Sequence, residues 1–460
     1  MLSKTTRVRR FPMRKDLTQG GVYRNLVFFS LPYLLACFLQ TFYGMADLFI
    51  TGQFNGAATI SAVSIGSQVM HMLTVIIVGL AMGTTIVIGR AIGAKNDRAL
   101  TAAVGTSIVC FAGLSLFLTA ALILGVSPIL TLLSTPPEAV AEARHYLLIC
   151  FAGIPFITAY NVLSSIFHGM GDTKSPMIFV GIAGVINLVM DYLLIGPMQM
   201  GAVGAALATV LSQAVSVFFA LAALRRFDLN IVLHRRDLHI DRSSFRTIFA
   251  IGVPIALQDG FVQIAFLFIT VIANQRGVNA AAAVGIVEKI ISFLFLVPSA
   301  MLSAISTIVA QNAGAGQHRR GRQTLFAAML TAVSFGLAVS LIVQCQAVPI
   351  LSLFARNDAA VITMGADYFR SYVFDCIFAA IHFCFSGYFC AYGKSLLSFV
   401  QNAVSVVAIR VPGAYLATRY FPHSLYPMGW AAPLGSLLSA ILCVIFFIAF
   451  RKHWSRNIPQ

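Results

Sequence analysis

Long apolar runs alternate with short polar segments from Leu26 almost to the end of the chain. Windows of about 19 residues separate twelve apolar segments, near 26–50, 59–88, 99–125, 142–166, 176–196, 201–224, 246–272, 281–308, 324–347, 366–390, 397–417 and 428–450. Each is long enough to cross the hydrocarbon core of a bilayer as an α-helix. The pattern therefore predicts an all-α polytopic membrane protein with twelve transmembrane helices.

Composition agrees with this pattern. Of the 460 residues, 59% are hydrophobic and 10% are charged, against roughly 25% charged in a typical soluble domain. The fifth and sixth segments are separated by little more than GPMQMG, which predicts a tight helical hairpin. The first apolar run is followed by many others, so we interpret it as a retained span and not as a cleaved signal peptide.

The formal net charge of +16 is distributed unevenly. The amino-terminal segment and every second loop hold 24 of the 31 Lys and Arg residues, in the segments 1–25, 89–98, 168–175, 225–246, 311–323, 393–395 and 451–460. This asymmetry places both termini on the cytoplasmic side of the cell (inner) membrane. The basic balance thus reflects topology and contact with anionic lipids, and we expect no nucleic-acid partner.

Two halves of the chain resemble each other weakly at a spacing of about 221 residues. FSLPYLL aligns with IGVPIAL, which sets Pro32 on Pro254, and FHGMGDTKS aligns with FCAYGKSLL, which sets Gly171 on Gly393. Six spans per copy give both copies the same orientation. We expect two pseudo-symmetric six-helix lobes that rock about a central cavity in alternating access. A duplicated scaffold without transport is the other interpretation.

The expected organisation follows from these boundaries. It comprises a basic cytoplasmic amino terminus, an N-lobe, a cytoplasmic linker, a C-lobe and a cytoplasmic carboxyl terminus, at 1–25, 26–224, 225–245, 246–450 and 451–460.

Polar residues inside the spans are the candidates for chemistry. An Asp at a helix centre costs roughly 2.5–3.5 kcal/mol on insertion scales, yet Asp47 and Asp191 lie in the first and fifth spans. Asn187 and Asp191 are four residues apart and share a helix face, and Thr209 lies midway along the adjacent sixth span. These oxygen ligands suit sodium or a proton shared between two carboxylates. Structural pairing of the acids, an interhelical hydrogen bond from Asn187 and back-bonding of Thr209 are the alternatives.

Four segments carry a resemblance to a known family. They are DLTQGGVYRNLVFFSLP (16–32), QTFYGMADLFITGQF (40–54), GMGDTKSP (169–176) and NLVMDYLLI followed by GAVGAALATVLSQ (187–213). In this order, and with the six-plus-six repeat, they resemble the multidrug and toxic compound extrusion (MATE) transporters, in their bacterial DinF/MepA-like branches. The resemblance extends over nearly the whole chain.

The resemblance implies export of cationic, amphipathic drugs in exchange for protons or sodium ions, with no organic cofactor and no other metal. It also implies that Asp47, Asn187, Asp191 and Thr209, which match the family's positions, form an N-lobe cation or proton site. Bending of the first span is thought to accompany cation binding, so Pro32 is a candidate hinge, with a static kink as the alternative. Because both lobes lie in one chain, a monomer surrounded by membrane lipids is sufficient.

Further residues are candidates for the substrate cavity. Gln40 and Tyr43 lie one to two turns before Asp47, and the Tyr43 ring could hold a cationic drug. Asn161 lies in the fourth span. Ordinary packing is the alternative for all three.

The C-lobe holds three more acids within spans, Asp259, Glu288 and Asp375. NorM-like and eukaryotic branches of the family carry a glutamate eight residues after the proline of the seventh span, where this chain has Val262. A C-lobe ion site of that kind is therefore not expected. Asp259 and Asp375 are candidates for shaping drug selectivity or for binding a second cation. Glu288 is followed by Lys289, and an internal ion pair is the alternative for Glu288.

Other functions fit less well. A flippase or exporter for a lipid-linked or other amphiphilic metabolite is the main alternative, but an anionic headgroup would favour more cations in the spans than Lys289, Arg370 and Arg410. An enzyme is not expected, since the chain has no P-loop, no GxSxG and no zinc-ligand spacing among its nine histidines. The eight cysteines lie in apolar runs without CxxC and are expected to be free thiols. No filter-like TVGYG segment suggests a channel.

Overall fold

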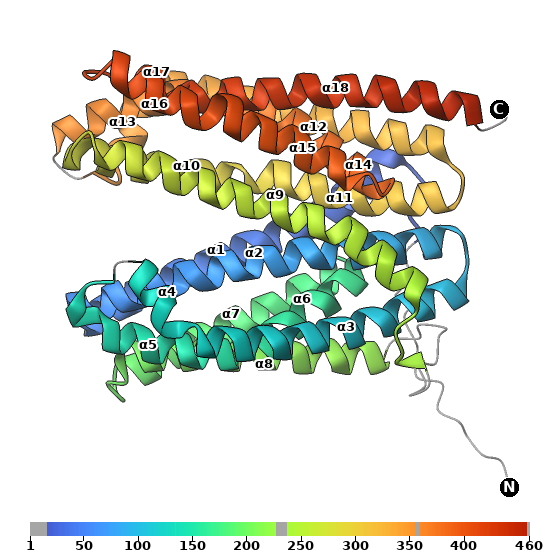
Figure 1. Cartoon of the computed structure of the whole chain (residues 1–460), viewed down its shortest axis with the longest axis horizontal. Helices are drawn as coiled ribbons and strands as arrows, with labels where there is room; N and C mark the ends of the chain where they lie inside the picture. Colours follow the sequence, from blue (N-terminus) through green and yellow to red (C-terminus); the bar gives the residue numbers. More distant parts are fainter. Residues whose placement is uncertain (1–15, 134, 227–236, 356–357, 458–460) are drawn as a thin grey trace, which may run out of the picture. The chain divides into compact units, whose positions relative to one another are not determined.

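The computed structural model describes residues 16–133, 135–226, 237–355 and 358–457 (Figure 1). For residues 225, 226 and 450–457 it describes the backbone alone. All regular elements in these ranges are helical. The first half holds α1 (Val22–Phe54), α2 (Ala57–Gly93), α3 (Asp97–Leu124), α4 (Val126–Leu132), α5 (Pro137–Ala152), α6 (Ile154–Gly169), α7 (Lys174–Ile195) and α8 (Gly201–Arg226). The second half holds α9 (Arg242–Asn274), α10 (Val278–Leu294), α11 (Leu296–Gly314), α12 (His318–Ser352), α13 (Ala359–Tyr372), α14 (Asp375–Ala391), α15 (Ser395–Ser405), the π-helical turn Val406–Arg410, α16 (Val411–Tyr420), α17 (Tyr426–Gly429) and α18 (Ala431–Asn457).

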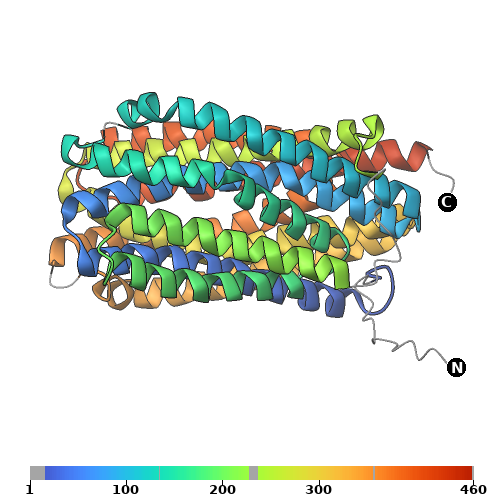
Figure 2. The same ribbon diagram turned by 90° about the horizontal axis from the view of Figure 1, so that it is seen from below.

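The twelve predicted spans are confirmed by the helices. Ten helical segments of the described chain are long and apolar enough to cross a membrane, and two bent pairs raise the number to twelve. The bent pairs are α5 with α6, at 47°, and α13 with α14, at 41°. The chain is thus a multi-pass membrane protein, and the predicted hairpin of the fifth and sixth spans is α7 and α8, which Figure 2 shows in green, side by side.

The two bends occur at equivalent positions of the repeat. Aligned on Pro32 and Pro254, Gly153 between α5 and α6 corresponds to Asp375 at the start of α14. A Cβ atom at Gly153 would lie 2.4 Å from Cγ2 of Val210, so a larger residue there would require α8 or the Val210 side chain to move. The apolar pattern predicts the crossing but not the bend, because both halves of each pair are apolar.

The chain divides into two compact units. Unit 1 comprises Met1–Gln19 with Leu31–Phe249, and unit 2 comprises Gly20–Ser30 with Ala250–Gln460. The division therefore crosses two helices, α1 between Ser30 and Leu31 and α9 between Phe249 and Ala250. Much of the predicted amino terminus, linker and carboxyl terminus, residues 1–15, 227–236 and 458–460, lies outside the described residues.

The internal repeat is visible in matching hydrogen bonds. In unit 1 the Thr85 hydroxyl donates to the carbonyl oxygen of Ser165 at 3.0 Å, and in unit 2 the Ser306 hydroxyl donates to that of Gly387 at 3.3 Å. Each bond joins a long helix to the second half of a bent pair, α2 to α6 and α11 to α14. The helices α6 and α14 then end in the same turn, in which Gly171 and Gly393 have φ angles of 85° and 68°. These left-handed conformations suit glycine.

Each unit has its own apolar core. In unit 1, Phe111, Phe167 and Phe179 form one cluster with α2, and a second cluster surrounds Tyr146 and Phe151 of α5. In unit 2, the core gathers around α10 and α13. Many other large apolar side chains are exposed along the helices, as expected where lipid replaces water as the solvent. The eight cysteines, all within the described ranges, are free thiols as predicted.

Candidate functional site

The predicted N-lobe site brings buried polar residues together. Asp47 on α1 and Asn187 and Asp191 on α7 are 5%, 1% and 0% exposed. Asp47 lies close enough to Asp191 for the two carboxyl groups to interact electrostatically. Neither carboxyl oxygen of Asp191, nor Oδ1 of Asp47, nor either polar atom of the Asn187 amide has a hydrogen-bond partner in the protein. Buried polar groups normally have partners, so this cluster is suited to a proton, a cation or water.

The register of the α7–α8 hairpin places Thr209 beside this cluster. Gly204 packs directly on Leu194, with 3.1 Å between its ideal Cβ position and the Leu194 Cβ. Further along, the Ser216 hydroxyl donates to the carbonyl oxygen of Phe179 at 3.5 Å. Between these two contacts, Thr209 on α8 comes to the level of the buried amide on α7. Thr209 is half-buried, and its backbone carbonyl accepts a hydrogen bond from Ser212.

Tyr43 joins α1 to the same hairpin. Its ring packs on Gly184 of α7, where a Cβ atom would lie 3.3 Å from the ring. Its hydroxyl group interacts with the side chains of Gln40 and Gln213. Gln40 and Tyr43 thus lie in one polar patch one to two turns from Asp47, and Gln213 on α8 is a member that the sequence analysis did not select. A glutamine in an apolar span was the available signal.

A tyrosine near Asp47, Tyr146, was also missed, as was Ser67, which it contacts. Tyr146 on α5 lies close enough to Asp47 to interact with it electrostatically, and its hydroxyl is 3.0 Å from that of Ser67 on α2. Tyr146 packs so tightly on Gly66 that a Cβ atom there would lie 2.2 Å from its ring.

Asn161, a predicted cavity residue, donates from its amide to the carbonyl oxygen of Ile157 on its own helix, at 2.8 Å.

A polar hollow lies near the end of α7. It is lined by the α7–α8 turn, by Asn55 just after the end of α1, and by polar residues of α2 and α5, namely Thr59, Glu142 and His145. Oε2 of Glu142 is buried there without a hydrogen-bond partner. Asp191 is one helical turn from Ile195, the last residue of α7. The hollow therefore brings polar surface within about two turns of the buried carboxyls.

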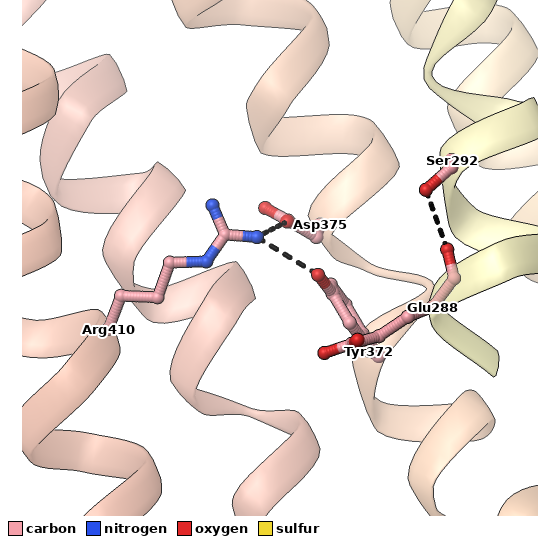
Figure 3. A network of polar contacts seen from close by, with 5 residues as sticks. All are labelled: Glu288, Ser292, Tyr372, Asp375 and Arg410. Carbon is pink, nitrogen blue, oxygen red and sulfur yellow. Dashed lines mark hydrogen bonds and ion pairs between the residues drawn. The ribbon is translucent and has the colours of Figure 1, made fainter. Parts of the chain in front are cut away.

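Two of the C-lobe acids, Asp375 and Glu288, lie beside a buried arginine. Arg410 donates from Nη2 to the hydroxyl of Tyr372 at 3.0 Å and to Oδ2 of Asp375 at 3.3 Å, as Figure 3 shows. Arg410 is 8% exposed and Asp375 is fully buried. Glu288 on α10 interacts electrostatically with Arg410, whereas the adjacent Lys289 is exposed. The internal ion pair that the sequence offers as an alternative role for Glu288 would thus be with Arg410 and not with Lys289.

Asp259 and Asp375 do not share a site in unit 2. Asp259 on α9 interacts electrostatically with Cys390, near the end of α14, whereas Asp375 is the first residue of α14. Fifteen residues of helix separate these ends by about 22 Å. A second cation held jointly by the two acids is therefore not supported, because Asp375 begins α14 and Asp259 lies on α9 beside the other end of α14.

Pro32, the predicted hinge, is buried within α1. The helix continues through the proline from Val22 to Phe54, and the boundary between the two units crosses α1 between Ser30 and Leu31, beside Pro32. In the other unit, Pro254 lies inside α9 in the same way.

A known family model matches both halves of the chain. The family model described as MatE matches the chain twice, at residues 32–193 and 254–416. The two matches begin at Pro32 and Pro254, the residues on which the internal repeat aligns. They therefore confirm both the duplication and its position.

Whole-chain relatives agree with the family match. The chain is 28% identical over 439 residues to the probable multidrug resistance protein YpnP of Bacillus subtilis, covering 95% of this chain and 97% of that protein. It is 26% identical to a protein of Shewanella oneidensis named FAD transporter, covering 95% and 96%. A crystal structure of MATE in complex with MaL6 has the same fold, with a TM-score of 0.90 and 22% identity over 96% of this chain and 99% of that one. The chain belongs to the MATE family of multidrug efflux transporters.

Proposed function

We propose that this transporter is a secondary active antiporter, which exports cationic amphipathic compounds in exchange for protons or sodium ions by alternating access. It acts as a monomer in the cell (inner) membrane with both termini cytoplasmic, and it needs no organic cofactor. The observation that supports the proposal most is the pair of buried carboxyl groups, Asp47 and Asp191, whose unpartnered oxygens adjoin the amide of Asn187.

A cation is the natural occupant of this cluster. Two carboxylates that are close together in a medium of low dielectric constant repel each other strongly. A sodium ion between them, or a proton on one of them, removes most of that repulsion and satisfies the orphaned oxygens. The binding energy of the cation is thereby available to favour one state of the transporter over the other, which is what coupling requires.

The polar hollow beside α7 supports access for the coupling ion. In the proposed orientation, the turn between the fifth and sixth spans faces the outside, where the ion enters. Glu142 and Asn55 line the hollow there and attract cations. On the substrate side, Tyr43 offers a ring and Gln40 an amide close to Asp47, which suits a flat organic cation.

Ethidium efflux from proteoliposomes tests the proposal. The purified protein is reconstituted, ethidium is loaded, and an inward proton gradient or an inward sodium gradient is imposed separately. Wild type is compared with Asp191→Asn and with Glu138→Gln, an exposed carboxylate at the start of α5. We expect one gradient to drive efflux in wild type and Glu138→Gln, and Asp191→Asn to abolish it. Normal transport by Asp191→Asn would show that this carboxyl group is structural.

A second candidate substrate class follows from one relative. The Shewanella oneidensis protein named FAD transporter covers almost the whole chain, so an amphiphilic metabolite is the alternative cargo. Vesicles loaded with FAD or with a lipid-linked sugar, under the same two gradients, measure this directly. Movement of such a compound, with no movement of ethidium or of other cationic drugs, would replace the drug by the metabolite as substrate.

A further inference from the structure

The coupling cluster of the N-lobe has no copy in the C-lobe. When the two halves are aligned on Pro32 and Pro254, the predicted residues of the first and fifth spans, Asp47, Asn187 and Asp191, fall on apolar or small residues, Ile269, Ile409 and Gly413. Ile269 is itself part of the apolar core of unit 2, 2% exposed. Duplication has therefore preserved the helices and the hydrogen bond that Thr85 and Ser306 each make, but not the carboxyl pair.

The charged cluster of the C-lobe is equally without a copy in the N-lobe. In the same alignment Glu288, Asp375 and Arg410 fall on Gly66, Gly153 and Leu188, and Tyr372 falls on Cys150. Only Tyr368, which also lies near these charges, has a tyrosine as its counterpart, Tyr146. At Gly66 and Gly153 a Cβ atom would clash with Tyr146 and Val210. The N-lobe has no room for the side chains that the C-lobe carries at these positions. The two lobes thus place their charges differently on one framework.

Arg410 is held from several sides in the C-lobe cluster. It ends the π-helical turn Val406–Arg410, a local widening of the eleventh span. Its guanidinium lies 5.4 Å from the centre of the Phe266 ring on α9, in addition to its hydrogen bonds to Tyr372 and Asp375. Figure 3 shows the side chain reaching across from its own helix to these two residues.

The surrounding groups offer oxygens to a cation. Asp375 is buried at the first position of α14, and its Oδ1 has no hydrogen-bond partner, although its Oδ2 accepts from Arg410. The hydroxyl of Tyr372, the half-buried carboxyl of Glu288 and the hydroxyl of Ser436, whose side chain interacts with Asp375, are other oxygens nearby. Without Arg410, two acids and a phenol would be left in a region of low dielectric constant, where an uncompensated charge is strongly unfavourable.

We infer that Arg410 is a tethered cation, whose guanidinium permanently occupies the position that a free monovalent cation would otherwise take between Asp375 and Tyr372. The C-lobe consequently binds no exchangeable metal cation, and ion coupling is confined to the N-lobe. The confinement of ion coupling to the N-lobe rests on the proposed antiport, whereas the occupation of the C-lobe position by Arg410 concerns binding alone. An arginine cannot leave in the transport cycle and stays protonated, so it stabilises the lobe without taking part in exchange.

Binding of radioactive sodium and rubidium to the full-length protein in detergent tests this inference at pH 8, without any transport. The starting protein is Asp47→Asn/Asp191→Asn, in which the N-lobe carboxyls are removed. To it we add Arg410→Met, which keeps an unbranched side chain but not the charge, or Arg410→Lys, which keeps a charge. We expect no saturable binding in the starting protein, one new saturable site with Arg410→Met, and none with Arg410→Lys.

Two results would overturn the inference. The first is saturable binding in the starting protein that Glu288→Gln removes, because a free cation would then bind beside Arg410. This arm remains decisive even if the Arg410→Met protein does not fold. The second is a folded Arg410→Met protein that binds neither ion. A failure of ethidium efflux in wild-type proteoliposomes would contradict the proposed antiport and leave these binding results unaffected.

Discussion

The carboxyl group of Asp47 on α1 lies close to that of Asp191 on α7, and neither Asp191 oxygen has a partner in the protein. If the two acids hold one ion together, removing either of them removes the whole site. We therefore expect Asp47→Asn and Asp191→Asn each to lower gradient-driven ethidium efflux by at least about tenfold, and the double variant to be no worse than either single one.

Initial rates of efflux in proteoliposomes measure this non-additivity. Equal amounts of reconstituted protein and an unchanged thermal midpoint in detergent are the controls for folding. Losses that multiply in the double variant would show that the two carboxyl groups act independently and that no shared site exists.

The ion pair of the C-lobe gives a prediction about stability. Asp375→Asn removes the carboxylate from a buried guanidinium, and breaking such a pair by removing one partner costs roughly 3–5 kcal/mol. We expect a clear fall in the thermal midpoint of the purified protein. Asp375→Asn combined with Arg410→Met removes both charges and should recover most of the loss. A single variant as stable as wild type would mean that water already solvates Arg410.

The spans and the repeat could be predicted from the sequence because they depend on local apolar periodicity. The shared face of Asn187 and Asp191 follows in the same way from their spacing on one helix. The bend before Asp375 could not be predicted, since neither glycine nor proline stands at that break. The bend at Gly153 does have a local signal, because Pro155 follows in the first turn of α6.

The partner of Asp375 illustrates a second limit. A buried acid in a span predicts a partner, and the sequence offers Lys289, Arg370 and Arg410 in or near the C-lobe spans. Selecting among them requires the packing of α13, α14 and the π-helical turn, because the residues come from different helices. Tyr372, the other acceptor for Arg410, has no charge and gives no signal in an apolar run.

Close packing of α2 and α9 within unit 1 leads to a prediction about a glycine. A Cβ atom at Gly83 would lie 2.2 Å from the carbonyl oxygen of Ile248, so that the backbone must move to accept it. We expect Gly83→Ala to destabilise the protein by roughly 1–3 kcal/mol. Gly113 on α3 is the matched control, since nothing lies within 4 Å of its Cβ position.

Alanine at Gly113 should be neutral or stabilising by up to about 1 kcal/mol, because alanine favours helix more than glycine does. The thermal midpoint of Gly83→Ala in detergent is therefore expected to lie below that of wild type, and that of Gly113→Ala at or above it. Equal midpoints for both variants would contradict the tight contact at Gly83.

Asp241, just before α9, gives a prediction about pH. Its Oδ2 accepts a hydrogen bond from the backbone amide of Ser244 at 2.7 Å, and this bond holds the pKa of Asp241 below its usual value. The stabilisation is fully present above the pKa of the unfolded chain, about 3.9, and is lost as the pH falls through the lower pKa of the folded state. Asp241→Ala should cost about 1 kcal/mol at neutral pH.

The difference in thermal midpoint between wild type and Asp241→Ala should therefore shrink below about pH 4. Asp241→Asn keeps an acceptor for the amide of Ser244 but cannot ionise. The difference in thermal midpoint between Asp241→Asn and Asp241→Ala should therefore not depend on pH. A wild-type advantage over Asp241→Ala that stays constant down to pH 3 would contradict this assignment of the cap.

Pro32 gives a prediction about the transport cycle. Proline lacks the amide hydrogen that would bond to the carbonyl oxygen one turn earlier, and a helix bends easily at such a point. The boundary between the two units crosses α1 beside this residue, and Asp47 lies further along the same helix. If α1 bends when the coupling ion binds, Pro32→Ala should slow ethidium efflux several-fold while equilibrium binding of the ion changes little.

Pro254→Ala is the matched control, because Pro254 occupies the equivalent position of α9 in a lobe that carries no coupling cluster. We expect it to leave the efflux rate within about twofold of wild type. Initial efflux rates at saturating gradient, compared with ion binding in detergent, separate a slower conformational step from a weaker site. Wild-type efflux by Pro32→Ala would show that the proline is a static feature of α1, and equal losses in both variants would show that proline at this position serves folding in each lobe.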